Sequence, residues 1–181
     1  MSEYFTRGII LERESSGESD DSLVIFTKDL GKIRAKVKSV KRIISKLSGH
    51  LQVGSLCDIR LTKKNNIQLI EAISYKSALS ADLHCFLGFI NQMTPYESPD
   101  HHLWYAIEYV IDKDIFISGE DILRRKVYRR LLDIMGFGPR LAKCSDCGTP
   151  KIAYFVPSDI MFLCSNSLLR APMKIYEAIK I

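Results

Sequence analysis

Basic side chains are concentrated in the segment from Lys28 to Lys46. Eight lysine and arginine residues there face a single acid, Asp29, which gives the segment a charge of +7, whereas the whole chain carries +5. Residues 31–38 alternate basic and apolar, and this period of two predicts a β-strand that presents its cations on one face. Regularly spaced cations suit the phosphates of a nucleic acid. The predicted DNA-binding residues are Lys32, Arg34, Lys36, Lys38, Lys41, Arg42 and Lys46.

A solvated strand face that only protects a sheet edge would have a similar composition. Segregation of charge favours ligand binding, because the positive field continues beyond the strand while acidic residues collect at positions 12–21. Aromatic residues are sparse beside the cations, since Phe26 and Tyr75 fall on other predicted strands. Base stacking should therefore contribute little, and we expect similar affinities for single- and double-stranded DNA.

Three cysteines in the last quarter of the chain are candidate metal ligands: Cys144, Cys147 and Cys164. The first two form a C-x-x-C pair followed by glycine, as in a zinc knuckle, and the third follows a predicted hairpin, so the sequence predicts that they could bind Zn²⁺. Ser167 stands where a second knuckle would have its fourth cysteine. The fourth ligand could be water, a carboxylate or a histidine, and the candidates are Asp146, His50, His101 and His102. A metal-free hairpin held by aromatic residues is the alternative.

Two enzymatic interpretations of these residues fail on their sequence context. A redox-active C-x-x-C would begin a helix after a strand, whereas this one follows the helix-stopping segment 136–139. A catalytic zinc would need a general base, and neither H-E-x-x-H nor H-x-E occurs in the chain. The sequence predicts a protein that is not an enzyme.

Short β-rich runs separated by turn residues occupy the first 75 positions. The five predicted strands are Thr6–Leu11, Ser22–Thr27, Gly31–Lys38, Leu56–Leu61 and Ile67–Tyr75. Five strands in so short a stretch favour a small closed barrel of the oligonucleotide-binding (OB) type, with an SH3-like barrel as the competitor. Residues 1–75 are therefore the predicted nucleic-acid-binding domain.

Helical periodicity replaces the strand pattern after residue 75. The second predicted helix begins at Ser98-Pro99, an N-cap followed by proline, and the third runs from about Gly119 to Met135. One face of the third helix is basic, either as a solvated surface or as an extension of a nucleic-acid track. The fold class is α+β: an OB-type barrel, then a helical domain over 76–181 with a zinc-ribbon-like cysteine hairpin at about 140–168.

The bulk composition is that of a globular chain. Its 181 residues are 46% hydrophobic, enough for a real core. No apolar run approaches the roughly 20 residues that span a bilayer, and the N-terminal residues do not resemble a signal peptide. Five cysteines, an odd number, fit a reducing compartment. We expect a cytoplasmic protein without a membrane partner.

Several short segments, in order along the chain, match the pattern of a known family. They are Gly8–Leu11, Gly17–Asp20, Leu23–Thr27, Gly31-Lys32, Lys36–Arg42 and Leu131–Pro139. The match covers nearly the full chain, and the order of barrel, helices and cysteine hairpin is more specific than any one segment. The chain resembles RecO, the bacterial recombination mediator of DNA repair.

The resemblance implies a nucleoid-associated DNA-binding protein that serves DNA recombination after DNA damage. It implies annealing of complementary single strands and, with a RecR-type partner, loading of recombinase onto DNA coated by single-stranded-DNA-binding protein. The alternative is a protein–protein adaptor of the repair machinery with weak or no DNA binding of its own. The family usually has glycine at Ser39, a fourth cysteine at Ser167 and further helices after residue 181, so the chain resembles a short variant.

Overall fold

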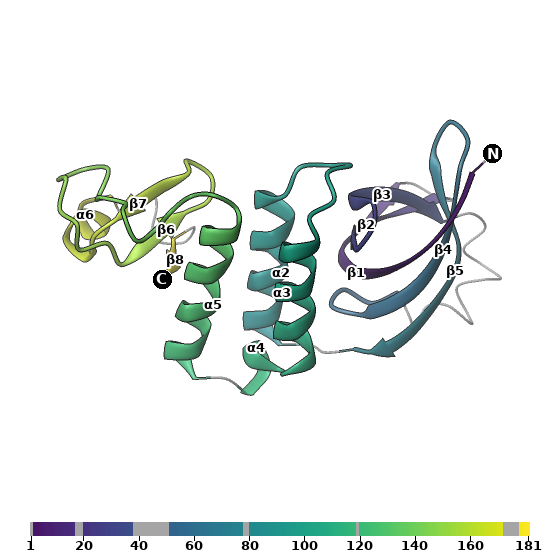
Figure 1. Ribbon diagram of the computed structural model, residues 1–181, viewed down its shortest axis with the longest axis horizontal. Coiled ribbons are helices and arrows are strands. Elements are labelled where there is room, and N and C mark those ends of the chain that lie inside the picture. The colour runs from purple at the N-terminus through teal and green to yellow at the C-terminus, as the bar shows by residue number, and fades with distance from the viewer. Residues whose placement is uncertain (1, 17–19, 38–50, 78–79, 119, 172–177) are drawn as a thin grey trace. The chain divides into compact units, whose positions relative to one another are not determined.

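The computed structural model describes residues 2–16, 20–37, 51–77, 80–118, 120–171 and 178–181 (Figure 1). The chain forms two compact units, Met1–Ile117 and Ser118–Ile181, which are described in turn.

Five strands of the first unit close into a barrel (Figure 1). They are β1 (Ser2–Ser16), β2 (Asp20–Thr27), β3 (Gly31–Val37), β4 (Leu56–Lys63) and β5 (Ile67–Lys76). The strand order is β1-β2-β3-β5-β4, and the barrel closes because β1 also pairs with β4. The predicted five-stranded barrel is confirmed, and each predicted strand has its counterpart.

The alternating pattern of β3 places its apolar residues inside the barrel. Ile33, Ala35 and Val37 are buried, while Arg34 and Lys36 between them are exposed. This is the separation of faces that a period of two requires of a strand. Side chains from the other four strands complete the same core.

β3 is only partly paired on the side of β5. The two strands run parallel and share a register at Lys36↔Gln68 and Val37↔Leu69 alone. Beside the first half of β3 lies the connector between helices α2 and α3, residues 94–100, where Tyr96 forms a bridge with Lys32. The amide of Glu97 donates a hydrogen bond of 2.8 Å to the Lys32 carbonyl. The connector thus satisfies part of an open strand edge.

Gly31 is required where the connector crosses β3. Its φ of +68° lies in the left-handed region, and a Cβ added there would lie 2.4 Å from the carbonyl carbon and oxygen of Ser98. Any other residue would meet both backbone strain and a collision with main-chain atoms. This glycine therefore sets how closely the connector approaches the strand.

Three helices follow the barrel: α2 (Ala81–Met93), α3 (His101–Asp112) and α4 (Ile115–Ser118), whose last residue is the first of the second unit. The predicted N-cap at Ser98 is wrong. The side chain of Asp100 caps α3 by accepting a hydrogen bond of 3.0 Å from the amide of Leu103, and the backbone of Tyr96 and Glu97 before it contacts β3.

The helices α2 and α3 contact the barrel directly. Trp104 of α3 is fully buried and stacks on Phe26 of β2 at 6.1 Å between ring centroids. Asn91 of α2 donates a hydrogen bond of 2.7 Å to Glu12 of β1. The predicted boundary after residue 75 lies close to the change from strands to helices. The division into two domains at this residue remains a prediction.

The second unit combines one long helix with a small sheet. Its elements are α5 (Asp121–Ile134), β6 (Tyr154–Val156), β7 (Met161–Leu163), α6 (Ser165–Arg170) and β8 (Ile179–Lys180). The sheet order is β7-β6-β8, and β6 and β7 form the predicted hairpin. Phe155 is buried between Phe137 and Phe162, with ring centroids 5.8 and 5.0 Å away. Neither unit contains, in its described part, a helix that is long and apolar enough to cross a membrane.

Candidate nucleic-acid interface and metal centre

The seven predicted DNA-binding residues have three different outcomes. Arg34 and Lys36 point outward from β3 and are exposed, whereas Lys32 is buried, with only 5% of its surface accessible to solvent. The other four, Lys38, Lys41, Arg42 and Lys46, lie outside the described residues. Among the described residues, Arg34 and Lys36 are therefore the predicted DNA-binding residues that remain accessible to DNA.

Lys32 is engaged inside the protein. Its ammonium donates a hydrogen bond of 2.5 Å to the carbonyl of Asn91, in the last turn of α2, and lies 4.4 Å from the centroid of the Tyr96 ring. Carbonyl groups at a helix C-terminus lack partners within the helix and favour a cation. Burial lowers the pKa of Lys32, repulsion by Arg34 lowers it further, and Glu12 partly opposes both. Lys32 therefore anchors α2 and the connector to β3.

A groove of about 600 Å³ opens beside the exposed part of β3. Strand β3, the β4–β5 hairpin and the α2–α3 connector each contribute side chains to it. The lining residues are Arg34, Lys36, Lys63, Asn65, Asn66, Ile67, Tyr96 and Glu97. We call this the Tyr96 groove. It lies at the strand face and β4–β5 loop through which OB barrels bind oligonucleotides.

Cations outnumber acids among the residues lining the Tyr96 groove. Arg34 pairs with Glu14 at 2.8 Å, and Lys63 pairs with Glu97 at 3.2 Å. All four of these side chains are about a third exposed or more, so the pairs are weak and the cations can turn to a phosphate at little cost. Lys36 has no ion-pair partner within the described part of the chain. The groove can accordingly accept an anionic backbone.

Tyr96, Lys63 and the two asparagines were missed by sequence reasoning. Tyr96 reaches the groove from a connector that follows β3 by about 60 residues, and only the contacts between β3 and the connector reveal it. One signal was present, since Pro95 and Pro99 flank Tyr96 and favour an extended segment. The expectation that aromatic residues are sparse beside the cations did not include Tyr96.

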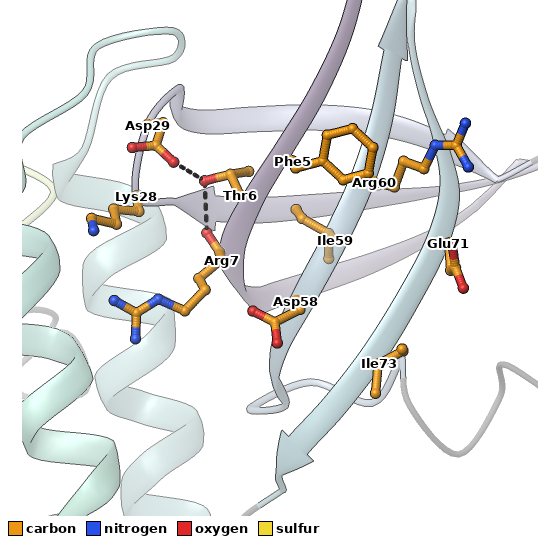
Figure 2. Close-up of a pocket in the computed structure, with 10 residues that line it drawn as sticks. All are labelled: Phe5, Thr6, Arg7, Lys28, Asp29, Asp58, Ile59, Arg60, Glu71 and Ile73. Carbon is orange, nitrogen blue, oxygen red and sulfur yellow. Dashed lines mark hydrogen bonds between the residues drawn. The ribbon is translucent and has the colours of Figure 1, made fainter.

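A second groove, of about 510 Å³, lies over β1, β4 and β5 and is drawn in Figure 2. We call it the Phe5 groove. Phe5 is 71% exposed and Ile73 57% exposed, although both belong to the barrel. The Arg60 guanidinium lies 5.5 Å from the centroid of the Phe5 ring. The other lining residues are Thr6, Arg7, Lys28, Asp29, Asp58, Ile59 and Glu71.

The charges of the Phe5 groove are mixed. Three cations and three acids line it. Thr6 donates a hydrogen bond of 2.5 Å to Asp29, and this bond is drawn as a dashed line in Figure 2. A polyanion gains little from such a surface, because each phosphate would also approach a carboxylate. Exposed apolar side chains with a mixed polar rim are typical of a surface that docks another protein.

The structure brings the three predicted metal ligands together. The sulfur atoms of Cys144, Cys147 and Cys164 all lie within 4.8 Å of one another, and the Cys147–Cys164 distance is 3.6 Å. In a tetrahedral site with Zn–S bonds of about 2.3 Å, sulfur atoms lie about 3.8 Å apart. The three thiols could therefore hold a metal ion, and Zn²⁺ fits both the donor type and the spacing.

The hydroxyl of Ser167 lies against this cluster. Its hydroxyl oxygen lies 3.3 Å from the sulfurs of Cys144 and Cys164 and donates a hydrogen bond of 2.7 Å to Asp146. Burial alone would raise the pKa of the Cys144 thiol, but its hydrogen bonds with Ser167 and with the backbone lower this pKa to about 6. Of the predicted candidates for a fourth ligand, Asp146 accepts the hydrogen bond of Ser167, and its carboxylate does not join the group of three sulfurs. His50 lies outside the described residues.

Comparison with known proteins gives a consistent answer over most of the chain. Residues 1–78 match the family model described as "Recombination protein O N terminal", and residues 84–173 match "Recombination protein O C terminal". A protein of Dehalococcoides mccartyi named DNA repair protein RecO is 26% identical over 91% of this chain and 70% of its own length. Proteins with the same name from Desulforudis audaxviator and Prosthecochloris aestuarii are 27% and 26% identical, covering 95% and 96% of this chain and 73% and 75% of their own lengths.

Proposed function

The chain belongs to the recombination protein O family, and from this premise we propose that it is a DNA-binding mediator that anneals complementary single strands. In this role it helps to load recombinase onto DNA coated by single-stranded-DNA-binding protein, together with a RecR-type partner. It acts in the cytoplasm at the nucleoid, and neither groove is assigned a catalytic step.

The observation that carries the proposal is the Tyr96 groove. Three cations, Arg34, Lys36 and Lys63, lie together on the ligand-binding face of an OB barrel. Arg34 and Lys63 form only weak, exposed ion pairs, and Lys36 forms none with the residues that the structure describes, so all three can neutralise phosphates. Contacts to phosphates do not depend on base sequence, as a mediator that serves any stretch of chromosome requires.

Annealing follows physically from such a surface. Two single strands repel each other through their phosphates, and a protein that neutralises part of this charge lowers the barrier to their encounter. Because contacts through phosphates leave base edges free, the bound strands can still pair. Displaced counterions make the process weaken as salt rises.

An annealing assay tests the proposal. Complementary oligonucleotides that carry a donor and an acceptor fluorophore are coated with single-stranded-DNA-binding protein, and energy transfer is followed after the chain is added. We expect annealing by the native chain and its loss in the triple variant Arg34→Ala, Lys36→Ala, Lys63→Ala. Equal annealing rates with and without the native chain would remove the proposed activity.

A second candidate function, that of an adaptor, is favoured by the Phe5 groove. Its exposed apolar residues Phe5 and Ile73 and its mixed charges suit a protein partner better than DNA. In that case the native chain would bind no DNA at near-physiological salt, while Phe5→Ala would weaken assembly with repair proteins. DNA binding by the isolated chain at that salt decides for the first candidate.

We propose a structural role for zinc at the cysteine cluster. Bound there, the ion would link the C-x-x-C turn to the end of the β6–β7 hairpin through Cys144, Cys147 and Cys164. Ser167 accepts hydrogen bonds from the thiols of Cys144 and Cys164, and it donates its own to Asp146. The cluster belongs to the second unit, whereas the residues that line the Tyr96 groove belong to the first.

A further inference from the structure

Tyr96 is an aromatic side chain exposed within a polar, cationic groove. Its surface is 46% accessible to solvent, although it contacts β3 through both backbone and side chain. The remaining lining of the groove consists of charged and amide groups together with Ile67. An aromatic ring presented among cations is the combination by which single-stranded nucleic acids are bound.

The position of Tyr96 is fixed before any ligand arrives. Its backbone bridges Lys32, the next amide bonds the Lys32 carbonyl at 2.8 Å, and the ring lies 4.4 Å from the Lys32 ammonium. Gly31 lets the connector approach the strand this closely. Because the ring is already held, a ligand that stacks on it loses little further conformational entropy of the protein.

The Tyr96 ring lies in contact with cations of β3. The Arg34 guanidinium lies 5.9 Å from the Tyr96 ring centroid, and Lys36 follows on the same face of β3. A base stacked on the ring therefore has its own phosphate within reach of a cation. Duplex DNA cannot use the ring in this way, since its bases are already stacked and paired.

We propose that Tyr96 is a stacking platform for an unpaired base, so that the Tyr96 groove prefers single-stranded to double-stranded DNA. The inference rests on the proposed DNA-binding function and refines it, because it assigns affinity to the bases as well as to the phosphates. It replaces the sequence-based expectation of similar affinities for both forms of DNA.

The test compares two labelled single-stranded probes of about 15 nucleotides, a length within the site sizes of OB barrels. One is oligothymidylate, and the other has the same backbone with abasic positions at its centre. Binding is measured by fluorescence anisotropy for the native chain and for Tyr96→Ala and Tyr96→Phe. Tyr109→Ala is the matched control, because Tyr109 is an exposed tyrosine of α3 that does not line the groove.

We expect Tyr96→Ala to weaken oligothymidylate binding by roughly 5- to 100-fold, as for loss of one stacking contact. Binding of the abasic probe should change by less than about twofold, and Tyr96→Phe and Tyr109→Ala should bind both probes like the native chain. Fluorescence of the single tryptophan, Trp104, during urea unfolding reports whether each variant keeps the fold of the first unit.

If Tyr96→Ala lost equal affinity for both probes, or lost none for either, the stacking role would be overturned. The proposed function would still stand if the native chain bound the abasic probe in a salt-dependent manner. Failure of the native chain to bind either probe would overturn both. Photocrosslinking of the native chain to an iodouracil-substituted oligonucleotide gives an answer that needs no variant. The crosslinked peptide should contain Tyr96, and crosslinks that form only elsewhere contradict the inference.

Discussion

Lys32 and Arg34 occupy successive outward positions on β3, yet their surroundings differ completely. Lys32 is covered by the α2–α3 connector and donates to the carbonyl of Asn91, whereas Arg34 is exposed and forms an ion pair with the partly exposed Glu14. Two cations of one strand thus have separate tasks. Lys32 holds helix and strand together, while Arg34 remains available to a ligand.

Methionine substitutions at Lys32 and at the exposed Lys36 should separate the structural task from the ligand-binding task. Lys32→Met removes the hydrogen bond to Asn91 but keeps the buried aliphatic stem, and we expect it to lower the free energy of unfolding by about 1–3 kcal/mol. Lys36→Met, its matched control on the exposed part of the strand, should change stability by less than about 0.5 kcal/mol and weaken DNA binding. Urea unfolding followed by Trp104 fluorescence measures stability. The assignment would be contradicted if Lys32→Met kept native stability and instead showed a DNA-binding defect like that of Lys36→Met.

The lowered pKa of Lys32 has its own consequence for stability at alkaline pH. Between that pKa and the ordinary value of 10.5, the unfolded chain binds more protons at this residue than the folded chain does. The contribution of Lys32 to the free energy of unfolding therefore rises as pH increases through this window. Urea unfolding of the native chain and of Lys32→Met over an alkaline pH series should show the rise in their difference. A difference that stays constant with pH is the contrary result.

At the scale of elements, local patterns predict what is built from neighbours in the chain. The alternation of residues 31–38 predicted the strand, and the C-x-x-C pair with its hairpin predicted the cysteine cluster, because both depend on short-range geometry. Burial of Lys32 and the place of Tyr96 depend on a connector that crosses β3, with Lys32 and Asn91 59 residues apart. No periodicity encodes such a contact.

Two glycines of the first unit should respond in opposite directions to alanine. Gly31→Ala combines a φ of +68° with a contact of 2.4 Å to the Ser98 backbone, so we expect a loss of about 2 kcal/mol or more. Gly88 lies exposed in the middle of α2 with nothing within 4 Å of an added Cβ, and Gly88→Ala should gain about 0.5–1 kcal/mol. Urea midpoints of the two variants test this. Equal effects would mean that the connector is not held against β3.

The cysteine hairpin should depend on zinc for its stability. We expect about one zinc ion per purified chain and a lower unfolding temperature after treatment with a chelator. Cys147→Ser should lose the metal, whereas Cys85→Ser, which alters an exposed cysteine of α2, should retain it. Elemental analysis with thermal unfolding measures both effects. Full zinc content in Cys147→Ser would show that the cluster is not the metal site.

At the scale of the whole molecule, charge is distributed over both units. The first unit has Arg34, Lys36 and Lys63 in the Tyr96 groove, and the second has an exposed basic face on α5 at Lys126, Arg129 and Arg130. A net charge of +5 would attract DNA to either surface without specificity. Only the groove adds an aromatic ring and the ligand-binding geometry of an OB barrel to its charge.

The most direct measurement is therefore the salt dependence of binding to single-stranded DNA, by anisotropy, for three proteins. They are the native chain, the groove variant with Arg34, Lys36 and Lys63 changed to alanine, and a charge-matched variant with Lys126, Arg129 and Arg130 changed to alanine. The slope of log affinity against log salt should become shallower by about 2 in the groove variant, at roughly 0.7 per phosphate contact, and stay close to native in the α5 variant. Equal slopes in the native chain and the groove variant, or equal changes in both variants, would contradict the Tyr96 groove as the DNA site.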